Sequence, residues 1–248
     1  MLKSLVADLH LHTVLSACAE VEMTPLLIVR RASQLGLGII GITDHNACLN
    51  AGAVMQAVQG TGISVLPGME LQTREEVHML CLFDSLERCW QWQDEVWAKL
   101  PGLENREEVF GPQFVVDASG DWVRTEPRLL STSADISIEA ATARVHELGG
   151  AAIPCHVDRP SFSLLANLGF IPPGLEADAL EVTVQFRPEK NPTLWGKLEG
   201  RPLVVSGDAH RLQDVQARTT LTVEEAVIPE ILQAFRGENG RSLKVNWS

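Results

Sequence analysis

Short apolar runs alternate with amphipathic segments along most of the chain, and such alternation of strand and helix patterns is typical of an α/β protein. Strands are predicted at residues 5–9, 38–42, 63–66, 76–83, 151–155, 178–184, 203–206, 219–223 and 243–245. Helices are predicted at residues 24–36, 50–58, 85–99, 137–148, 191–198 and 228–235. Thr24-Pro25 is a start signal for the first of these helices and Gly36 is its stop signal.

Two stretches break this alternation. Only seven residues separate Glu70 from His78, too few for a helical crossover, so the two segments that carry them are expected to pair antiparallel. Between residues 101 and 135 the periodicity weakens, and a hairpin is predicted at residues 113–123. We interpret residues 101–135 as an insertion, for which a lid, a subunit contact and an inert surface excursion all stay open.

The composition fits an ordinary globular protein. Of the 248 residues, 45% are apolar, which is enough for a deep core, and we expect one domain over residues 1–248. No apolar run is long enough to span a bilayer, and residues 1–4 lead straight into a strand pattern rather than a signal peptide. We therefore expect a cytoplasmic protein without a membrane partner.

Charge and cysteine content exclude further classes. Twenty basic and 32 acidic residues give a net charge of −12, the wrong sign for non-specific binding to nucleic acid, which we expect only as a short oligonucleotide substrate. The five cysteines are odd in number and contain no C-x-x-C, so neither a disulfide framework nor a zinc ribbon is predicted. The sequence does not indicate an oligomeric state.

Ligand-type side chains follow the predicted strands. His10-Leu11-His12 closes the first strand, and the period of two places both imidazoles on one face. Further histidines and carboxylates lie in or just after later strand runs: His45, Glu70, His78, His156, Asp208 and His210. Because active sites of α/β folds are built at the carboxyl ends of strands, we expect these side chains to converge there.

Ordinary packing can explain one histidine in or just after a predicted strand. It does not explain six such histidines together with two carboxylates. Burying them side by side would cost many kcal/mol unless cations compensated their charges and lone pairs. A set of His, Asp and Glu without several thiolates fits zinc, manganese or iron. The exception is His146, which lies on a predicted helix and is expected to be structural or exposed to solvent.

Taken in chain order, these residues form a series of short motifs. They are His10-x-His12, Thr43-Asp44-His45, Gly68-Met69-Glu70, His78, Cys155-His156 and Gly207-Asp208-Ala209-His210, and the series spans residues 8–210. The series resembles the ordered motifs of the PHP (polymerase and histidinol phosphatase) domain family. This resemblance implies an α/β fold that is a distorted (β/α)7 TIM-like barrel, a metal centre at the carboxyl ends of its strands, and phosphoester hydrolysis.

The resemblance also implies a set of ligands for two or three divalent metal ions (zinc, manganese or iron): His10, His12, Cys18, His45, Glu70, His78, His156, Asp208 and His210. The first ion would be held by His10, His12, Glu70 and Asp208, the second by Glu70, His78 and His156, and the third by His45 and His210. The remaining family position falls on Cys18, six residues after His12. A thiolate ligand and an inert cysteine are both open there.

In the mechanism that the resemblance implies, a metal-activated hydroxide attacks phosphorus, because paired cations lower the pKa of water from about 15.7 toward about 7. The leaving alkoxide needs a proton, and the candidate catalytic residues are His45, His210 and Asp208. Candidate contacts to substrate phosphate are Arg159, Arg187 and Arg211, each with a surface salt bridge as the alternative. Arg159 is favoured because its loop begins at a predicted ligand.

Two aspartates precede motif histidines. Asp8 lies two residues before His10 and Asp44 lies one residue before His45. A neighbouring carboxylate can fix the tautomer of a ligand imidazole, so each aspartate is a candidate for that role, with strand-end capping as the alternative.

We therefore expect a metal-dependent phosphatase or phosphodiesterase of PHP type that acts on a phosphomonoester or phosphodiester of a small metabolite or nucleotide. Two alternatives stay open. An amidohydrolase-like C–N hydrolase also carries H-x-H on its first strand and would release ammonia or open a ring. A non-catalytic, metal-stabilised module would bind metal and a partner protein without hydrolysing a phosphoester.

Overall fold

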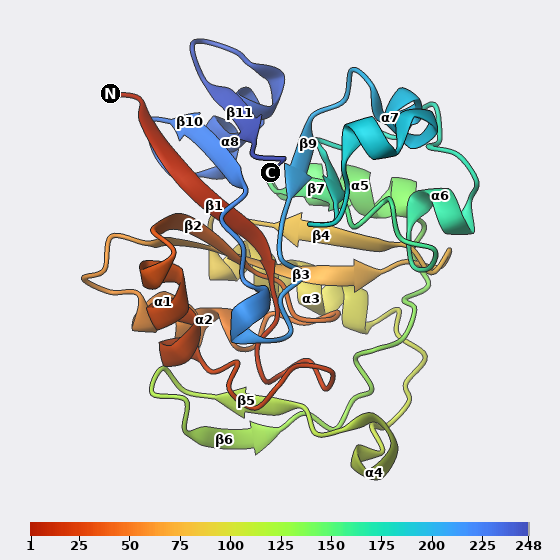
Figure 1. The fold of residues 1–248 in the computed structure, drawn as a ribbon. Helices are drawn as coiled ribbons and strands as arrows, with labels where there is room; N and C mark the ends of the chain where they lie inside the picture. Colours follow the sequence, from red (N-terminus) through yellow and green to blue (C-terminus); the bar gives the residue numbers. More distant parts are fainter. Residues whose placement is uncertain (248) are drawn as a thin grey trace.

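The computed structural model describes residues 1–247, and Ser248 lies outside the described residues. A curled sheet of seven strands runs through the molecule (Figure 1). In spatial order the strands are β11 (Ser242–Val245), β10 (Thr219–Val223), β1 (Lys3–Leu11), β2 (Leu37–Ile42), β3 (Ser64–Gln72), β4 (His78–Leu82) and β7 (Ala151–Pro154). The three central strands β1, β2 and β3 are parallel, and all other neighbours in this sheet pair antiparallel.

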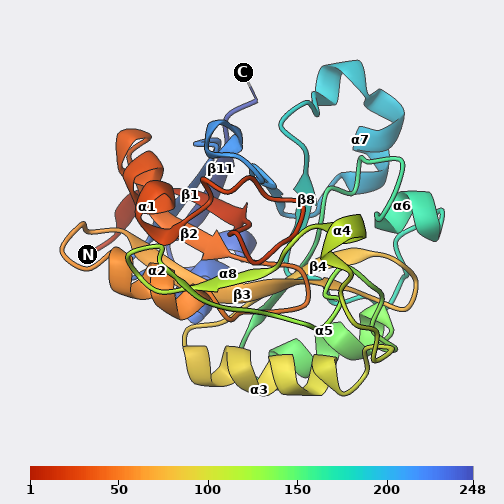
Figure 2. The same ribbon diagram turned by 90° about the horizontal axis from the view of Figure 1, so that it is seen from below.

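Helices cover both faces of the sheet (Figure 2). The helices of one face share an apolar core with β2, β3 and β4; they are α1 (Pro25–Gln34), α2 (Ala51–Ala57), α3 (Leu86–Trp97) and α5 (Ile138–Glu147). On the other face α8 (Ile228–Arg236) packs against β10 and β11. Three short helices lie outside these layers: α4 (Glu107–Phe110), α6 (Leu164–Asn167) and α7 (Pro192–Leu198). Among residues 1–247, no helix has both the length and the apolar character that a bilayer span requires.

Because the central strands are buried on both faces, polar functional side chains are expected at the strand ends. Along β4, Met79 and Cys81 join the core under α3 and α5, whereas Leu80 and Leu82 join the core under α8. This alternation follows the period of two of a strand. All five residues of β4 are buried, so the side chain of His78 at its first position lies at the edge of a dry interior.

The α/β class is as predicted, but the described residues do not form a continuous (β/α)7 barrel. The two short strands β8 (Leu180–Val182) and β9 (Leu203–Val205) pair in parallel as a separate sheet. Isolated backbone hydrogen bonds, including Asp178 N to Ala152 O and Ala209 N to His10 O, link this pair to the large sheet, as do two hydrogen bonds between the Thr219 hydroxyl and the Val205 backbone. Strands of three residues are too short for full ladders, and β10 and β11 extend the sheet beyond β1 instead of closing it.

The boundaries of most elements follow the hydrophobic pattern, with three differences. The antiparallel pairing of the Glu70 and His78 segments is confirmed, and it lengthens β3 to Gln72, because β4 supplies ladder partners for residues 68–72. The helices α4 and α6 were not predicted, since four residues are too few to show a helical period. Pro25 begins α1 as expected, but the side chain of Thr24 makes no capping hydrogen bond.

A bulge in β1 shapes the start of the candidate site. Asp8 pairs with Ile40 and Leu11 pairs with Ile42, so three steps along β1 face two steps along β2. Gly41 lies beside this bulge, and a Cβ atom there would be 2.3 Å from the carbonyl oxygen of Leu9. Only glycine allows the two backbones to approach this closely.

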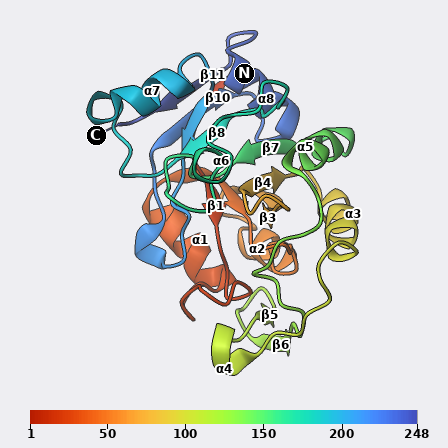
Figure 3. The same ribbon diagram turned by 90° about the vertical axis from the view of Figure 1, so that its right-hand side faces the viewer.

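The stretch 101–135 carries the predicted hairpin, formed by β5 (Phe114–Val116) and β6 (Trp122–Thr125), which lies at the bottom of the view in Figure 3. Two buried asparagines bind it to the loop that follows β2. Asn46 donates from Nδ2 to the carbonyl oxygens of Leu130 and Thr132, both at 2.7 Å. Asn50 donates to the Phe114 oxygen and accepts from Val116 N at 2.9 and 3.0 Å. The stretch is therefore fixed to the segment that bears His45.

Candidate metal centre

The predicted ligands converge at one end of the strands. His10, Glu70 and His78 lie on β1, β3 and β4, and the other five histidines and carboxylates of the series follow strand ends: His12, His45, His156, Asp208 and His210. Glu70 lies at the centre of the group, with its carboxylate 1% exposed and within 3.4 Å of five imidazoles. Distant segments of the chain thus deliver their ligand-type side chains to one place.

The four residues assigned to the first ion form a compact set. The Nε2 atoms of His10 and His12 are 3.1 Å apart, and both lie 3.2–3.3 Å from Oδ1 of Asp208. Glu70 completes the set with its Oε1 atom 3.4 Å from His10 Nε2. Ligand atoms of all four residues lie within 4.8 Å of one another, which is the spacing of side chains that can share one cation.

Glu70 extends this set toward the second group. Its Oε1 atom lies 2.8 Å from His78 Nδ1 and 3.2 Å from His156 Nε2. The other oxygen, Oε2, lies 3.3 Å from His12 Nε2 of the first group, so one carboxylate reaches both groups. Glu70 thus contacts both other residues assigned to the second ion, His78 and His156, whose ring centroids are 5.4 Å apart.

Cys18 lies beside the third group, His45 and His210, at an exposed position. Its Sγ atom is 3.3 Å from His45 Nε2, and His45 Nδ1 lies 3.0 Å from Glu70 Oε2. The ring of His210 stacks on the ring of His12 with centroids 4.1 Å apart. Burial disfavours a thiolate at Cys18, but hydrogen bonds with His210 and His45 outweigh it and lower the pKa of the thiol to about 5. Cys18 is therefore a good donor for a borderline metal.

Buried polar atoms without a hydrogen-bond partner indicate whether the cluster is suited to bind cations. Four buried side-chain atoms of this cluster make no hydrogen bond of good geometry in residues 1–247: Glu70 Oε2, His78 Nε2, His156 Nδ1 and Asp208 Oδ1. The two carboxylate oxygens among them have imidazole nitrogens within 3.3 Å, but none is aligned for a hydrogen bond. An unpaired buried polar atom is costly unless something else satisfies it. A set of imidazole and carboxylate donors around such atoms fits divalent transition metals.

The pKa shifts within the cluster also favour bound cations. Burial disfavours charge at His10, but the carboxylates of Glu181, Asp208 and Glu70 raise the pKa of His10 well above its usual value. Burial likewise opposes ionisation of Glu70, and the imidazoles around it still hold the pKa of Glu70 well below the usual range. Without metal the carboxylates favour protonation of His10 and His45, so metal ions and protons compete for this part of the cluster.

Glu181 is a site residue that the sequence reasoning missed. It lies on β8, is 1% exposed, and its Oε2 atom is 3.0 Å from His10 Nδ1. Its Oε1 atom accepts a hydrogen bond from the backbone N–H of His156 at 3.2 Å. A lone carboxylate between Leu180 and Val182 in an otherwise apolar strand was the available signal.

The two aspartates before the motif histidines have different roles. Asp44 accepts from Ser16 Oγ at 2.7 Å, and that hydroxyl lies 2.9 Å from His12 Nδ1, so Asp44 orients an imidazole through a serine. Asp8 does not contact an imidazole. It accepts backbone N–H groups of Gly207 and Gln216 at 2.9 and 2.7 Å, which makes the prediction for Asp8 wrong and its strand-end alternative right.

Only one of the three predicted arginines reaches the cluster. Arg159 Nη1 lies 2.5 Å from Asp208 Oδ2, and the side chain of Arg159 is 42% exposed, so one end of it faces open space. Arg187 donates to the carbonyl oxygens of Val184 and Phe186 within its own loop. Arg211 pairs with Glu20 at the surface. His146 also lies away from the cluster, 2.8 Å from Asp178, as a structural residue.

Two of the predicted ligands adopt an uncommon backbone conformation. His156 has φ of 31° and Asp208 has φ of 44°, both in the left-handed region that residues other than glycine rarely enter. Such strained positions cluster at functional sites, where the surrounding structure holds them. At both positions the backbone turns away from the preceding strand, and the side chain of the same residue lies in the cluster.

Comparison with known proteins supports the motif series. Residues 8–109 match the family model of the PHP domain. A curated relative, the 5′-3′ exoribonuclease Rnm of Salmonella typhimurium, is 30% identical over 84 residues, which are 32% of this chain and 28% of the relative. The chain therefore spans less than a third of that enzyme.

Solved structures share the fold over a greater length. The lesion-specific endonuclease PfuEndoQ of Pyrococcus furiosus superposes with a TM-score of 0.71 at 19% identity, over 97% of this chain and 58% of that one. A putative metal-dependent phosphoesterase of Bifidobacterium adolescentis gives a TM-score of 0.56 at 21% identity, over 83% and 87% of the two chains. The match of residues 8–109 to the PHP-domain model confirms the resemblance seen in the motifs over that part of the chain.

Proposed function

We propose that this protein is a metal-dependent hydrolase that cleaves a phosphoester bond of a nucleotide or short oligonucleotide. The observation that carries the proposal is the convergence of imidazoles, carboxylates and one thiol around unpaired buried lone pairs, with a half-exposed arginine beside them. The names of the similar proteins, an exoribonuclease, an endonuclease and a phosphoesterase, support a phosphoester substrate. These names also weigh against the expectation, drawn from the net charge, that nucleic acid is disfavoured.

Bound divalent ions would lower the pKa of water and neutralise charge on the phosphate oxygens. The protein's own residues have three further tasks. Arg159 offers N–H donors that can bind a phosphate oxygen, since its guanidinium is held by Asp208 at one side only. His45 and His210 lie at the more exposed edge of the cluster, 12% and 25% exposed, where either can pass a proton to the leaving oxygen. Glu181 and Ser16 keep the imidazoles of His10 and His12 in position.

We infer three metal positions, with Cys18 as a ligand of the third together with His45 and His210. The short distance from the thiol to His45 and its lowered pKa support this assignment. Metal analysis of Cys18→Ala should then give one ion per chain fewer than the wild type. Metal should also protect Cys18 from alkylation by iodoacetamide. Equal metal contents in the two proteins would leave Cys18 an inert residue.

We also infer that residues 1–248 form a single domain in which 101–135 is an insertion. One large core cluster with members from Leu11 to Val215 supports this division.

The test is a panel of phosphomonoesters, phosphodiesters and short oligonucleotides, assayed with metal-loaded protein and with a chelator control. Asp208→Asn should lower kcat/KM by more than about 100-fold, because even the outer hydrogen-bond partners of metal ligands are worth about 10- to 100-fold. Asp135→Asn removes an exposed carboxylate with the same change of charge and should behave as the wild type. Ammonia release from amide substrates would favour the C–N hydrolase. Bound metal without hydrolysis of any phosphoester would favour the binding module.

A further inference from the structure

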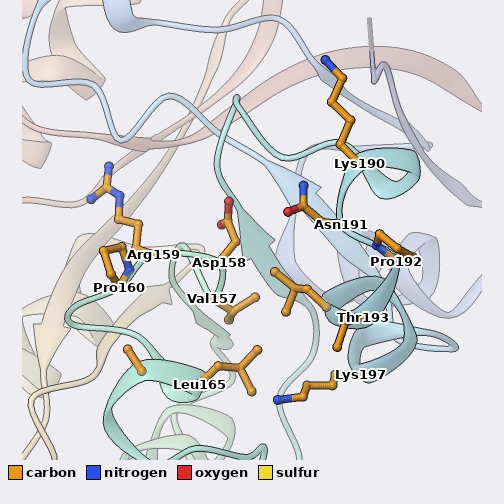
Figure 4. Close-up of a pocket in the computed structure, with 12 residues that line it drawn as sticks. Val157, Asp158, Arg159, Pro160, Leu165, Lys190, Asn191, Pro192, Thr193 and Lys197 are labelled. Carbon is orange, nitrogen blue, oxygen red and sulfur yellow. The ribbon is translucent and has the colours of Figure 1, made fainter.

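A cavity of about 550 Å³ lies next to the candidate metal centre (Figure 4). It is formed by the loop after β7, by α6 and by the start of α7. Its volume is in the range of about 300 to 1,000 Å³ that is usual for small-molecule sites. Arg159 lines this cavity and also lines a smaller one of about 220 Å³ that reaches His156 and Asp208. The guanidinium of Arg159 therefore lies between the metal centre and the larger cavity.

The cavity has an apolar floor and a polar rim. Of the residues labelled in Figure 4, Val157 is buried and Leu165 is half-buried, whereas Lys190, Asn191 and Lys197 are exposed. An apolar surface of this size can hold the flat face of a nucleobase, and the polar groups at the edge can bind sugar and phosphate.

The charge at the rim is unusual for so acidic a protein. Although the net charge is −12, neither Lys190 nor Lys197 makes an ion pair in the part of the chain that the structure describes. The cavity wall also contains the carboxylate of Asp158. This carboxylate already accepts two hydrogen bonds from Thr183, one from the backbone N and one from Oγ1, at 2.8 and 2.6 Å. Two cations without ion-pair partners at one rim indicate an anionic ligand.

The same loop exposes an aromatic ring at the metal centre. The side chain of Phe162 stacks on His78 with ring centroids 4.8 Å apart, and Phe162 is 41% exposed. Its φ of 53° is a strained conformation for a bulky residue. Exposed aromatic rings beside cations are the combination that binds single-stranded nucleic acid.

We propose that this cavity is a nucleotide subsite, which receives the nucleoside next to the scissile phosphate and contacts the two following phosphates, one through Lys190 and one through Lys197. This proposal rests on the proposed function and narrows its substrate class to short single-stranded oligonucleotides. A substrate with one phosphate and no neighbouring nucleotide would use only the metal centre and Arg159. The subsite would thus make the protein prefer an oligonucleotide over a compact phosphate ester.

The first test measures binding of a fluorescent single-stranded pentanucleotide with phosphorothioate linkages, in RNA and DNA forms, to the metal-loaded full chain. The Lys190→Ala/Lys197→Ala variant should bind more weakly than the wild type. For this variant, the slope of log K against the logarithm of the salt concentration should be smaller in magnitude than for the wild type by about 1.4. Each of the two lost phosphate contacts with a single strand contributes about 0.7 to this slope. Lys3→Ala/Lys244→Ala removes the same charge from exposed positions on β1 and β11 and is the matched control. A salt slope equal to that of the control variant would overturn the subsite.

A second variant tests the cavity without changing charge. Ala166 is exposed at the cavity wall, so Ala166→Trp should fill the space without disturbing the core. We expect the ratio of kcat/KM for the same pentanucleotide with ordinary phosphodiester linkages to that for 4-nitrophenyl phosphate to fall about tenfold, as expected when about 1.4 kcal/mol of binding is lost. An unchanged ratio would overturn the subsite and leave the proposed function standing. If the wild type hydrolysed no phosphoester, the proposed function would fail, and the binding experiment would still decide on the subsite.

Discussion

Glu181 was not among the predicted ligands, but the geometry of the metal centre depends on it. It contacts His10 Nδ1 and the backbone of His156, which are parts of two neighbouring groups of donors. A carboxylate behind a ligand imidazole fixes its tautomer and raises its basicity. Glu181→Gln keeps an acceptor oxygen but loses the charge. We expect the affinity for zinc or manganese to fall by about 10- to 100-fold, measured by competition with a chromogenic chelator.

The matched control for this substitution is Glu199→Gln, an exposed carboxylate after α7. It should bind metal as tightly as the wild type. An affinity of Glu181→Gln within twofold of that control would mean that Glu181 has no influence on the metal centre.

His146 provides a pH-dependent contribution to stability away from the site. Its hydrogen bond with Asp178 raises the pKa of His146 above the ordinary 6.5. A histidine with a raised pKa in the folded state stabilises the fold below the unfolded value, and this stabilisation is lost as pH rises through the folded value. We expect the difference in unfolding free energy between wild type and His146→Gln to be largest below pH 6.5 and to shrink above it.

Urea unfolding at a series of pH values, with chelator present throughout, measures this difference. Glu139→Gln changes an exposed residue of the same helix and should show no such dependence in this range. A difference for His146→Gln that grows with pH would contradict the assignment.

At the scale of elements, the close contact between β1 and β2 sets the position of His10 and His12. Gly41 allows this contact, because any Cβ there would meet the Leu9 carbonyl oxygen. Gly41→Ala should destabilise the protein by about 1–3 kcal/mol, as for other overpacked interiors, and should weaken metal binding because β1 must shift. Chemical unfolding and metal titration check both effects.

Gly196 in α7 is the matched control. A Cβ at Gly196 would meet nothing within 4 Å, and alanine is the better helix former, so Gly196→Ala should be neutral or slightly stabilising. If Gly41→Ala were as stable as this control, the close approach of β1 and β2 would not require glycine.

Elements and ligands differ in how far the sequence predicted them. Strand positions and the ligand series were predictable, because apolar runs and the histidines that end them are local signals. Strand direction was predictable only where the connection was short, as between Glu70 and His78. The antiparallel pairing of β4 and β7 depends on contacts across the insertion, for which periodicity carries no signal. Glu181 was missed because its signal, one carboxylate between two apolar residues, is weak: the strand predicted at residues 178–184 also contains Asp178 and Thr183.

For the molecule as a whole, metal binding and folding should be coupled. The ligands come from β1, β3, β4 and from the loops after β2, β7 and β9, so the unfolded chain has no assembled site. Any metal ion that binds only the folded chain stabilises it by about 2.7 kcal/mol at 100 times its dissociation constant. We expect zinc or manganese to raise the melting temperature of chelator-treated protein.

Asp208→Asn should remove most of this increase, whereas Asp135→Asn should retain it. Scanning calorimetry with and without metal measures the effect. An identical rise in both variants would place the stabilising metal elsewhere in the molecule.

The hydrogen bonds from Asn46 and Asn50 to residues 114–132 also limit how this protein can be rebuilt. Excising residues 101–135 would strip partners from two asparagine side chains in the loop that carries His45. Apolar replacements at both asparagines would not repair this, because Asn46 also accepts a hydrogen bond from Gln72 N and Asn50 also donates one to Thr13 Oγ1. In any redesign by loop exchange, the graft therefore has to include residues 46 and 50 together with the stretch they bind.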